Sequence, residues 1–199
     1  VLGEDRTAPQ QTVDAEDPKS VEYAEAAFRP DRDAIDFYES MEGMQVGVRD
    51  AEVVGPTGYE IPVVPGSAVE ATRSSAGGVV YGGYDQPNAM RVLVDDVLLP
   101  SGSLPDADVR DRLPGLVAGP LDYSFANFKL LATQVPTVEE GGLEREVTQP
   151  QHDRELSVAS FNVENLAPGN DQSKFDRLAG QIVTNLRSPD VIAVEEVQD

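Results

Sequence analysis

Four polar side chains near the C-terminus of the sequence have types and spacing suited to binding a metal ion. Asn162 and Glu164 follow the apolar run LSVASF, and a pair of glutamates, Glu195 and Glu196, follows the run VIAV. Amide and carboxylate oxygens are hard ligands, the kind that Mg²⁺ and Ca²⁺ bind together with water molecules. Because the acidic pair lies within an apolar strand, we expect one of the two carboxylates to point into the protein. A buried carboxylate is costly, so it must be paired, protonated or metal-bound. The spacing leaves one alternative open, an edge strand whose glutamates are solvated.

A strand, a helix and a second strand are expected to position these side chains. The segments Leu156 to Val163 and Val191 to Val197 have the apolar composition of strands that are covered on both faces. Between them, Lys174 to Leu186 gathers its apolar residues on one helical face. This order predicts a βαβ unit with parallel strands and a right-handed crossover. Because parallel strands end at the same edge of a sheet, Asn162 and Glu196 should meet there.

The sequence before this unit has a different pattern and predicts a separate module. From Met44 to about Val138, apolar and polar residues alternate in short runs that Gly and Pro separate. This pattern is typical of an antiparallel, OB-like β-barrel or sandwich, so the expected fold class is α+β and mainly β. We expect a linker with a short helix over residues 1–39, the β module over 40–138, a linker over 139–155 and the βαβ part over 156–199.

Two local features of the β module follow from residue types. Asp33 to Met41 has helical spacing, and Leu121 to Leu130 predicts a hairpin with its turn at Ala126–Asn127, since Asn tolerates positive φ. Aromatic residues near the strands are expected to pack in the core, because strand aromatics usually do. Their exposure on one barrel face near arginine would instead favour polymer binding. The aromatic residues concerned are Tyr81, Tyr123, Phe125 and Phe128.

Composition and charge exclude several kinds of chemistry. The 199 residues include no cysteine, which excludes disulfides, thiol catalysis and cysteine-bound zinc. No apolar run approaches the roughly 20 residues that a membrane-spanning helix needs, so no membrane contact is expected. The single histidine, His152, falls in the 139–155 linker and is given no role. A net charge of −21 repels phosphate groups, so phosphate chemistry would need a metal cation.

Two motifs resemble the opening of a known enzyme superfamily. The string SFNVENL, from Ser160 to Leu166, is followed by a helix and then by SPDVIAVEEVQD, from Ser188 to Asp199. Together they resemble the first two motifs of the endonuclease/exonuclease/phosphatase superfamily. Upstream, DFYESMEGMQV and GPLDYSFANFKL resemble segments that precede the catalytic domain in large secreted bacterial nucleases, where an OB-like module comes first. The resemblance covers about residues 36–199.

The resemblance assigns roles to three residues. Asn162 matches the active-site asparagine of the superfamily, and Glu196 matches the glutamate that binds its catalytic Mg²⁺ or Ca²⁺. Glu195 stands where Gln or Met is usual, so it remains the alternative metal ligand. The general-base histidine and the other ligands of the superfamily come from later strands. We therefore expect residues 156–199 to open a truncated α/β-sandwich nuclease domain that is inactive alone and binds Mg²⁺ only weakly.

The implied function is that of part of a secreted, divalent-metal-dependent nuclease that hydrolyses phosphodiester bonds of DNA or RNA. No secretory signal is visible, so a bacterial extracellular location follows from the resemblance alone. The expected partners are nucleic acid, as substrate of the intact enzyme, and the remainder of the catalytic domain. Two alternatives stay open: a phosphatase or lipid phosphodiesterase of the same superfamily, and a non-catalytic module that binds a polymer or acts as a spacer.

Overall fold

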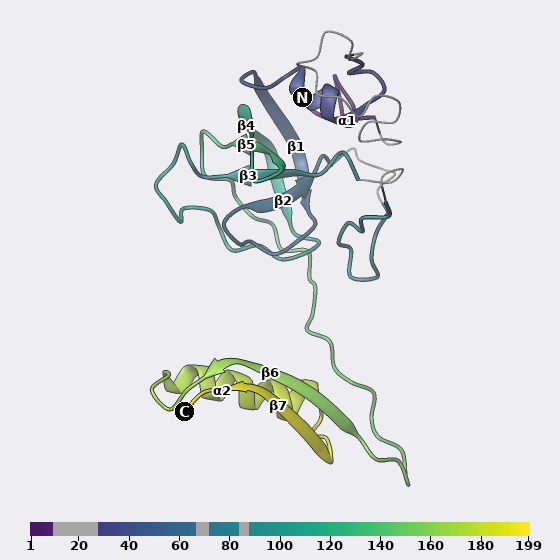
Figure 1. Ribbon diagram of the computed structural model, residues 1–199, viewed down its shortest axis with the longest axis vertical. Helices are drawn as coiled ribbons and strands as arrows, with labels where there is room; N and C mark the ends of the chain where they lie inside the picture. The colour runs from purple at the N-terminus through teal and green to yellow at the C-terminus, as the bar shows by residue number, and fades with distance from the viewer. Residues whose placement is uncertain (10–27, 67–71, 84–87) are drawn as a thin grey trace. The chain divides into compact units, whose positions relative to one another are not determined.

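The chain divides into two compact units in the computed structural model, which describes residues 1–9, 28–66, 72–83 and 88–199 (Figure 1). The barrel unit spans Val1–Leu143, and the β6–β7 unit spans Glu144–Asp199. The linker predicted over residues 1–39 falls partly outside the described residues. None of the helices in the described ranges is long and apolar enough to cross a bilayer.

Five strands form a closed barrel in the first unit, which is consistent with the OB-like, mainly β module that the sequence predicts. The order around the ring is β1–β2–β3–β5–β4. The strands are β1 (Gln45–Val53), β2 (Ile61–Val64), β3 (Val92–Asp95), β4 (Arg112–Ser124) and β5 (Asn127–Leu131).

The prediction of a wholly antiparallel module is wrong for one pair, because β3 and β5 run parallel. The other four pairs around the ring are antiparallel. A closed ring with an odd number of strands does not allow every neighbouring pair to alternate in direction. At least one parallel pair is therefore required by closure, whatever the local sequence pattern.

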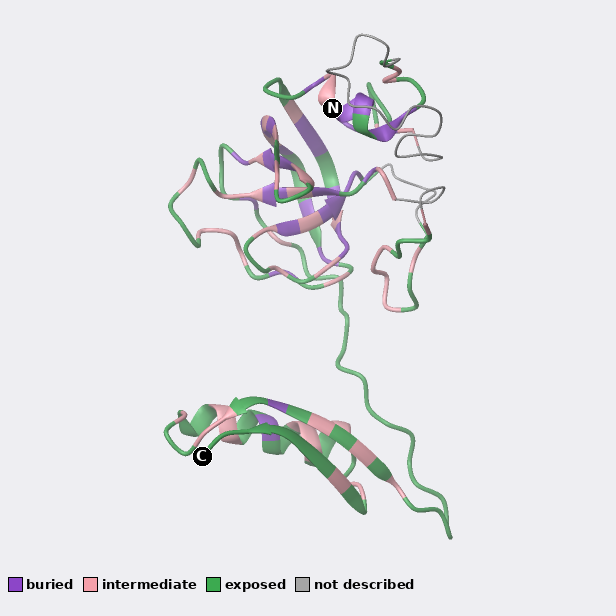
Figure 2. Ribbon diagram, in the orientation of Figure 1, coloured by how far each residue is buried: buried purple, intermediate pink, exposed green. Residues whose placement is uncertain are grey.

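Alternating apolar residues fill the barrel, as Figure 2 shows for the buried stretches of the strands. In β3, Val92 and Val94 are fully buried while the residues between and after them are only partly covered. The helix α1 (Ala34–Glu39) confirms the short helix predicted over Asp33 to Met41. It adds Phe37 and Tyr38 to the same core. Period-two burial on the strands and one apolar helix face together account for this core.

The hairpin between β4 and β5 exists, but its turn lies one residue earlier than predicted. Phe125 and Ala126 occupy the two turn positions, with φ of 49° and 60°. Asn127 is instead the first residue of β5, paired with Ser124, and its side-chain amide donates to the Phe125 carbonyl at 2.8 Å. A two-residue hairpin turn of this hand needs positive φ at both positions, so Asn127 supports the turn from outside it.

Lys129 joins three segments on the parallel side of the barrel. Its ammonium group donates hydrogen bonds to the carboxylate of Glu60, just before β2, and to that of Asp95 in β3, the latter at 2.9 Å. The Lys129 side chain is only 5% exposed. Burial acts to lower the pKa of Lys129, but the two hydrogen bonds and the two negative charges raise the pKa on balance. The ammonium is therefore kept charged where β5, β3 and the start of β2 meet.

The second unit contains β6 (Val158–Leu166), α2 (Gln172–Gly180), a π-helical turn η1 (Gln181–Asn185) and β7 (Val191–Val197). The two strands pair in parallel. The more sheltered face of the helical segment carries Leu178, which is buried, and Phe175 and Ile182, which are partly covered. On the sheet, Val158 and Val191 are paired in register and exposed. One face of a parallel pair thus remains uncovered, although parallel sheets are usually covered on both faces.

Replacing Lys129 should destabilise the barrel unit far more than replacing an exposed cation does. Lys129→Met leaves the carboxylates of Glu60 and Asp95 half-buried beside each other, so we expect a loss of about 3 kcal/mol in unfolding free energy. Arg49→Met is the matched control, because Arg49 pairs with Glu4 at an exposed site and should cost less than about 1 kcal/mol. The chain has no tryptophan and all its tyrosines lie before residue 144, so urea unfolding followed by tyrosine fluorescence reports on this unit alone. Equal losses in the two variants would contradict a structural role for Lys129, Glu60 and Asp95, which we call the Lys129 triad.

Candidate functional site

The carboxyl ends of β6 and β7 hold the three residues that the sequence predicts as a site, and we call Asn162, Glu195 and Glu196 the carboxyl edge. Asn162 and Glu195 occupy paired positions of the two parallel strands. Glu196 is the next residue along β7, where strand alternation directs a side chain to the opposite face of the sheet from Glu195 and Asn162. In a parallel pair, residues at paired positions project from the same face of the sheet, so Asn162 and Glu195 share a face.

The two glutamates of the carboxyl edge differ in their hydrogen bonding. Ser160, two residues before Asn162 on the same face of β6, donates its hydroxyl to the Glu195 carboxylate. Within the described residues, the Glu196 carboxylate has no hydrogen bond or ion pair. Glu196 is therefore wholly uncommitted, while Glu195 keeps further acceptor sites beside the one that Ser160 uses. Sequence reasoning missed Ser160, although its spacing of two from Asn162 places it on the same strand face.

The expectation that one carboxylate points into the protein is wrong, because Glu195 and Glu196 are both exposed. The physical reason is that β7 belongs to a two-stranded sheet, so the described residues provide no layer over its carboxyl end. The exposure of both glutamates agrees with the alternative, an edge strand whose glutamates are solvated.

The backbone at the carboxyl edge is irregular in both strands. The strand register breaks between Asn162 and Leu166, and Glu164 and Asn165 in between have φ of 55°. Glu196 in β7 has φ of 60°. Left-handed conformations cost about 1–2 kcal/mol for residues other than glycine, and such strain gathers at functional sites. The Asn162 side-chain oxygen accepts the backbone N–H of Glu164 at 2.8 Å, which fixes the start of the bulge.

Helix α2 is tied to this bulge by Glu164. Its carboxylate accepts two hydrogen bonds from the Arg177 guanidinium, at 3.2 and 2.7 Å. Lys174, one helical turn earlier, donates its ammonium group to the Glu164 carbonyl. The hydrogen bonds from Arg177, more than its charge, lower the pKa of Glu164. The sequence placed Glu164 at the edge but missed these two partners, which the spacing of three residues on one helix face could have indicated.

The opposite, amino end of the sheet is held by Asp190. Its carboxylate accepts the backbone N–H and the hydroxyl of Ser157, each at 3.0 Å, and the side-chain amide of Gln151 at 2.7 Å. The hydrogen bond from the Ser157 backbone is the largest cause of a lowered pKa for Asp190. His152 lines a pocket at this amino end. The only histidine of the chain is thus separated from the carboxyl edge by the length of the strands.

The donor set of the carboxyl edge fits Mg²⁺ in chemical type but is incomplete. Glu196, Glu195 and the amide of Asn162 offer hard oxygen atoms, and Mg²⁺ is commonly bound by one or two carboxylates with water in the other positions. In the parts of the chain that are described, no group of three or more histidine or acidic side chains is arranged to hold a metal ion. Further ligands would be needed for tight binding.

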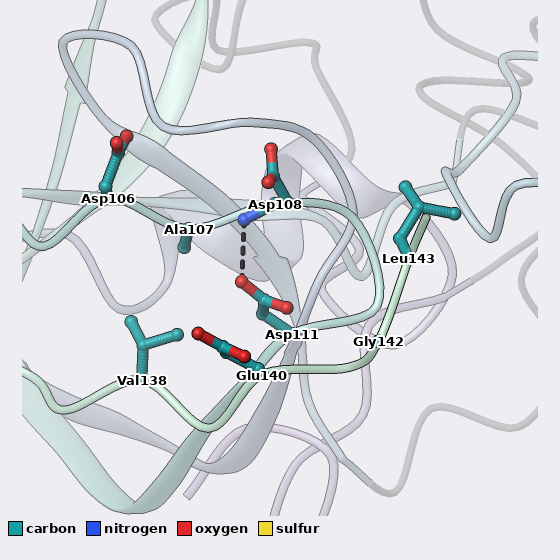
Figure 3. A pocket seen from close by; sticks show the side chains of 8 residues that line it. All are labelled: Asp106, Ala107, Asp108, Asp111, Val138, Glu140, Gly142 and Leu143. Carbon is teal, nitrogen blue, oxygen red and sulfur yellow. Dashed lines mark hydrogen bonds between the residues drawn. The ribbon is translucent and has the colours of Figure 1, made fainter. Parts of the chain in front are cut away.

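A second acidic site lies in the barrel unit, where a pocket of about 470 Å³ is bordered by Asp106, Asp108 and Glu140 (Figure 3). Asp111, which also lines it, is buried and structural, because its two oxygens accept the backbone N–H groups of Asp108 and Gly141 at 2.8 and 2.7 Å. The hydrogen bonds of Asp111 explain why a carboxylate is tolerated there.

Most of the aromatic residues expected in the core are exposed instead. Phe128 packs as predicted, stacking on Tyr38 with ring centroids 4.7 Å apart. Tyr81, Tyr123 and Phe125 are all exposed, so the expectation of core packing is wrong for these three. Phe125 occupies a turn outside the sheet, where no core face is available. Arg91 donates to Asn127 at 2.7 Å beside this turn, so an arginine lies near one exposed ring, which is part of the arrangement that would favour polymer binding.

Comparison with known proteins assigns the barrel unit to a protein family. Residues 1–140 match the family described as "Domain of unknown function (DUF8508)". The chain belongs to the DUF8508 family. The DUF8508 match ends just before the boundary between the two units, so the carboxyl edge lies outside it. No curated protein and no solved structure matches the chain.

The link between Glu164 and Arg177 predicts a measurable shift in titration. In a ¹³C carboxyl NMR titration, Glu164 should titrate below the value of about 4.3 that is usual for glutamate. Arg177→Gln should raise it again, while the control Arg187→Gln, whose guanidinium bonds the Thr148 carbonyl, should leave it unchanged. Because the folded-state pKa is lowered, this pair stabilises the unit above about pH 4.3 and ceases to do so as the pH falls through the lowered value. An unchanged titration of Glu164 in Arg177→Gln would contradict the pairing.

Proposed function

We propose that the β6–β7 unit supplies one part of the active site of a secreted, divalent-metal-dependent nuclease. The observation that carries the proposal is the parallel pairing of Asn162 with Glu195, with the uncommitted carboxylate of Glu196 one residue further along. The motifs SFNVENL and DVIAVEEVQD, which resemble the opening of the endonuclease/exonuclease/phosphatase superfamily, lie on these two strands.

Each residue of the carboxyl edge has a distinct task in this proposal. Glu196 would bind Mg²⁺ or Ca²⁺ through its free carboxylate, and Asn162 would orient a phosphate oxygen through its amide N–H groups, since its oxygen is held by Glu164. Ser160 uses one acceptor site of Glu195, so that carboxylate remains the alternative metal ligand. When bound, the metal supplies charge neutralisation and an acidified water molecule. A chain of net charge −21 needs that neutralisation to approach a phosphodiester.

Among the residues that the structure describes, none supplies a general base or further metal ligands at this edge. His152 lies at the amino end of the strands, and the carboxylates at the carboxyl end are too few to complete a metal site. We propose that additional strands of a complete catalytic domain would provide these groups and cover the exposed face that carries Val158 and Val191. The chain by itself then binds metal weakly and does not turn over.

Two other functions are compatible with the same residues. A phosphatase or a lipid phosphodiesterase would use the same two motifs, because these bind the metal and the phosphate rather than the rest of the substrate. A non-catalytic role in binding a polymer is favoured by a separate observation, the exposed rings of the barrel unit.

Metal binding can be tested directly with Mn²⁺ in place of Mg²⁺. Paramagnetic broadening of amide signals in ¹⁵N spectra should be strong for residues around Glu196 and should be lost in Glu196→Gln, which keeps the side-chain shape but removes the charge. Glu195→Gln is the matched control and should retain most of the broadening, because it leaves the Glu196 carboxylate unchanged. Residues near Asp106 and Asp108 give an internal reference for binding by acidic surface. Broadening that persists in Glu196→Gln and disappears in Glu195→Gln would transfer the role to Glu195.

The purified 199-residue chain should not cleave DNA or RNA in the presence of Mg²⁺ above the level of a control with chelator. The reason is the absence of a base and of sufficient ligands at the carboxyl edge. A fluorogenic oligonucleotide assay measures this sensitively. Robust turnover that Glu196→Ala abolishes would show that the described residues are sufficient and would contradict the claim of an incomplete site.

A further inference from the structure

The buried cation of the barrel unit is a lysine, in a chain that otherwise relies on arginine. Among the described residues, Lys129 is the only buried cation. The sequence has 15 lysines and arginines, and only Lys19, Lys129 and Lys174 are lysines. Arginine is the usual choice for a buried ion pair, because it keeps its proton and bonds carboxylates in a fixed geometry. A lysine at position 129 allows a reaction that an arginine would not, since an amine becomes a nucleophile when a neighbouring group takes its proton.

The Lys129 triad places this amine against two carboxylates from other segments of the chain. The Lys129 nitrogen lies 2.9 Å from Oδ2 of Asp95, so the carboxyl carbon of Asp95 is one bond beyond that contact. The same nitrogen donates to Oε1 of Glu60. The side chains of Lys129, Asp95 and Glu60 are 5, 15 and 25% exposed, so their contacts are largely shielded from solvent. The site therefore holds an amine, a carboxyl group for it to attack and a second carboxylate that can accept a proton.

The parallel pairing of β3 with β5 holds the amine and the Asp95 carboxyl group in contact. Lys129 pairs with Leu93, and Asp95 lies two residues further along β3, so Lys129 and Asp95 project from the same face. The backbone N–H of Val97 donates to the other oxygen of Asp95 at 2.8 Å, which fixes this carboxyl group further. Groups oriented in this way can reach effective concentrations of about 10⁵–10⁸ M. Such a contact favours a condensation that does not occur between free amines and carboxylates in water.

The charges of the Lys129 triad favour the same reaction. One ammonium group faces two carboxylates, so one negative charge of this half-buried site is left uncompensated. Taking charges out of water is costly even when they are paired. An amide bond between Lys129 and Asp95 removes two of the three charges, and the carboxylate that remains is that of Glu60, the most exposed of the three side chains.

We propose that the barrel unit joins Lys129 to Asp95 by an amide bond without any other enzyme, an inference that is independent of the proposed nuclease. Glu60 takes a proton from the Lys129 ammonium group, and the neutral amine attacks the carboxyl carbon of Asp95. The bond between nitrogen and carbon forms as the bond from that carbon to one oxygen breaks. Two protons of the former ammonium group leave with this oxygen as water, and the third stays on the amide nitrogen. Glu60 carries the protons and ends as a carboxylate again, so no oxidant, nucleotide or metal is consumed.

The amide bond closes the barrel covalently on its parallel side, where β3 pairs with β5. Asp95 and Lys129 are 34 positions apart in the sequence, so the bond encloses the segment that contains β4 in a loop. A cross-link of this kind restricts the unfolded chain in the way that a disulfide does. The chain has no cysteine with which to form a disulfide.

Intact mass spectrometry of the purified full chain tests the proposal directly. We expect a mass that is lower than the mass of the sequence by one water molecule. Trypsin should then leave residues 92–110 joined to residues 113–145, because it does not cleave after a lysine whose amine is part of an amide bond. Fragment ions of the joined peptides should locate the bond at Asp95 and Lys129. A mass equal to that of the sequence would overturn the proposal and leave the Lys129 triad as an ion pair only.

Three variants assign the roles within the triad. Lys129→Arg keeps a cation that cannot form the bond, and Asp95→Ala removes the carbon that is attacked, so both should have the masses of their sequences. Glu60→Gln should lose water about a hundredfold more slowly, because its amide cannot take the proton, and unreacted chain should remain after purification. Glu52→Gln is the matched control, since the Glu52 carboxylate pairs with Arg73 at a similar exposure, and it should lose water as the parent does.

Loss of water that persists in Lys129→Arg or Asp95→Ala would place the reaction elsewhere and contradict the proposal, and unchanged loss in Glu60→Gln would contradict the role of Glu60. A cooperative urea transition in tyrosine fluorescence shows that a variant is folded, so that a missing bond reports on the chemistry. The stability of Lys129→Met does not decide the question, because this variant removes the ion pair and the amide bond alike. The metal-binding experiment concerns the other unit, so its outcome has no bearing on these results.

Discussion

Parallel pairing of β6 with β7 is the constraint on which the candidate site depends. Antiparallel strands would place Asn162 and Glu196 at opposite ends of the sheet, and no metal or phosphate would then contact both. Parallel strands place them at one edge, where the register pairs Asn162 with Glu195. The bulge after Asn162 and the link from Glu164 to Arg177 then attach the helix to that same edge. The site and the position of the helix both follow from this strand direction.

The barrel unit obeys a different constraint, the closure of five strands into a ring. Closure requires one parallel pair, and Lys129 reinforces that side of the ring with its bonds to Glu60 and Asp95. The same lysine also lies over the Phe125 ring of the β4–β5 turn.

Sequence patterns predict local structure here better than long-range contacts. The period-two pattern indicated the strands of the barrel, and residue types placed the Leu121 to Leu130 hairpin within one residue of its turn. The parallel direction of β3 and β5 was missed because it follows from the number of strands in a closed ring. The Lys129 triad was missed because its members lie far apart in the sequence. Aromatic residues near strands were expected inside, but Phe125 occupies a turn, and side-chain type does not distinguish these two positions.

The carboxyl edge depends most directly on the register of the β6–β7 pair, which nuclear Overhauser effects measure in the ¹³C,¹⁵N-labelled chain. Cross-strand backbone contacts should connect Phe161 with Val194 and Asn162 with Glu195, in the pattern of a parallel ladder. Contacts of an antiparallel ladder, or a register that separates Asn162 from Glu195 and Glu196, would contradict the account, because the carboxyl edge would then not exist.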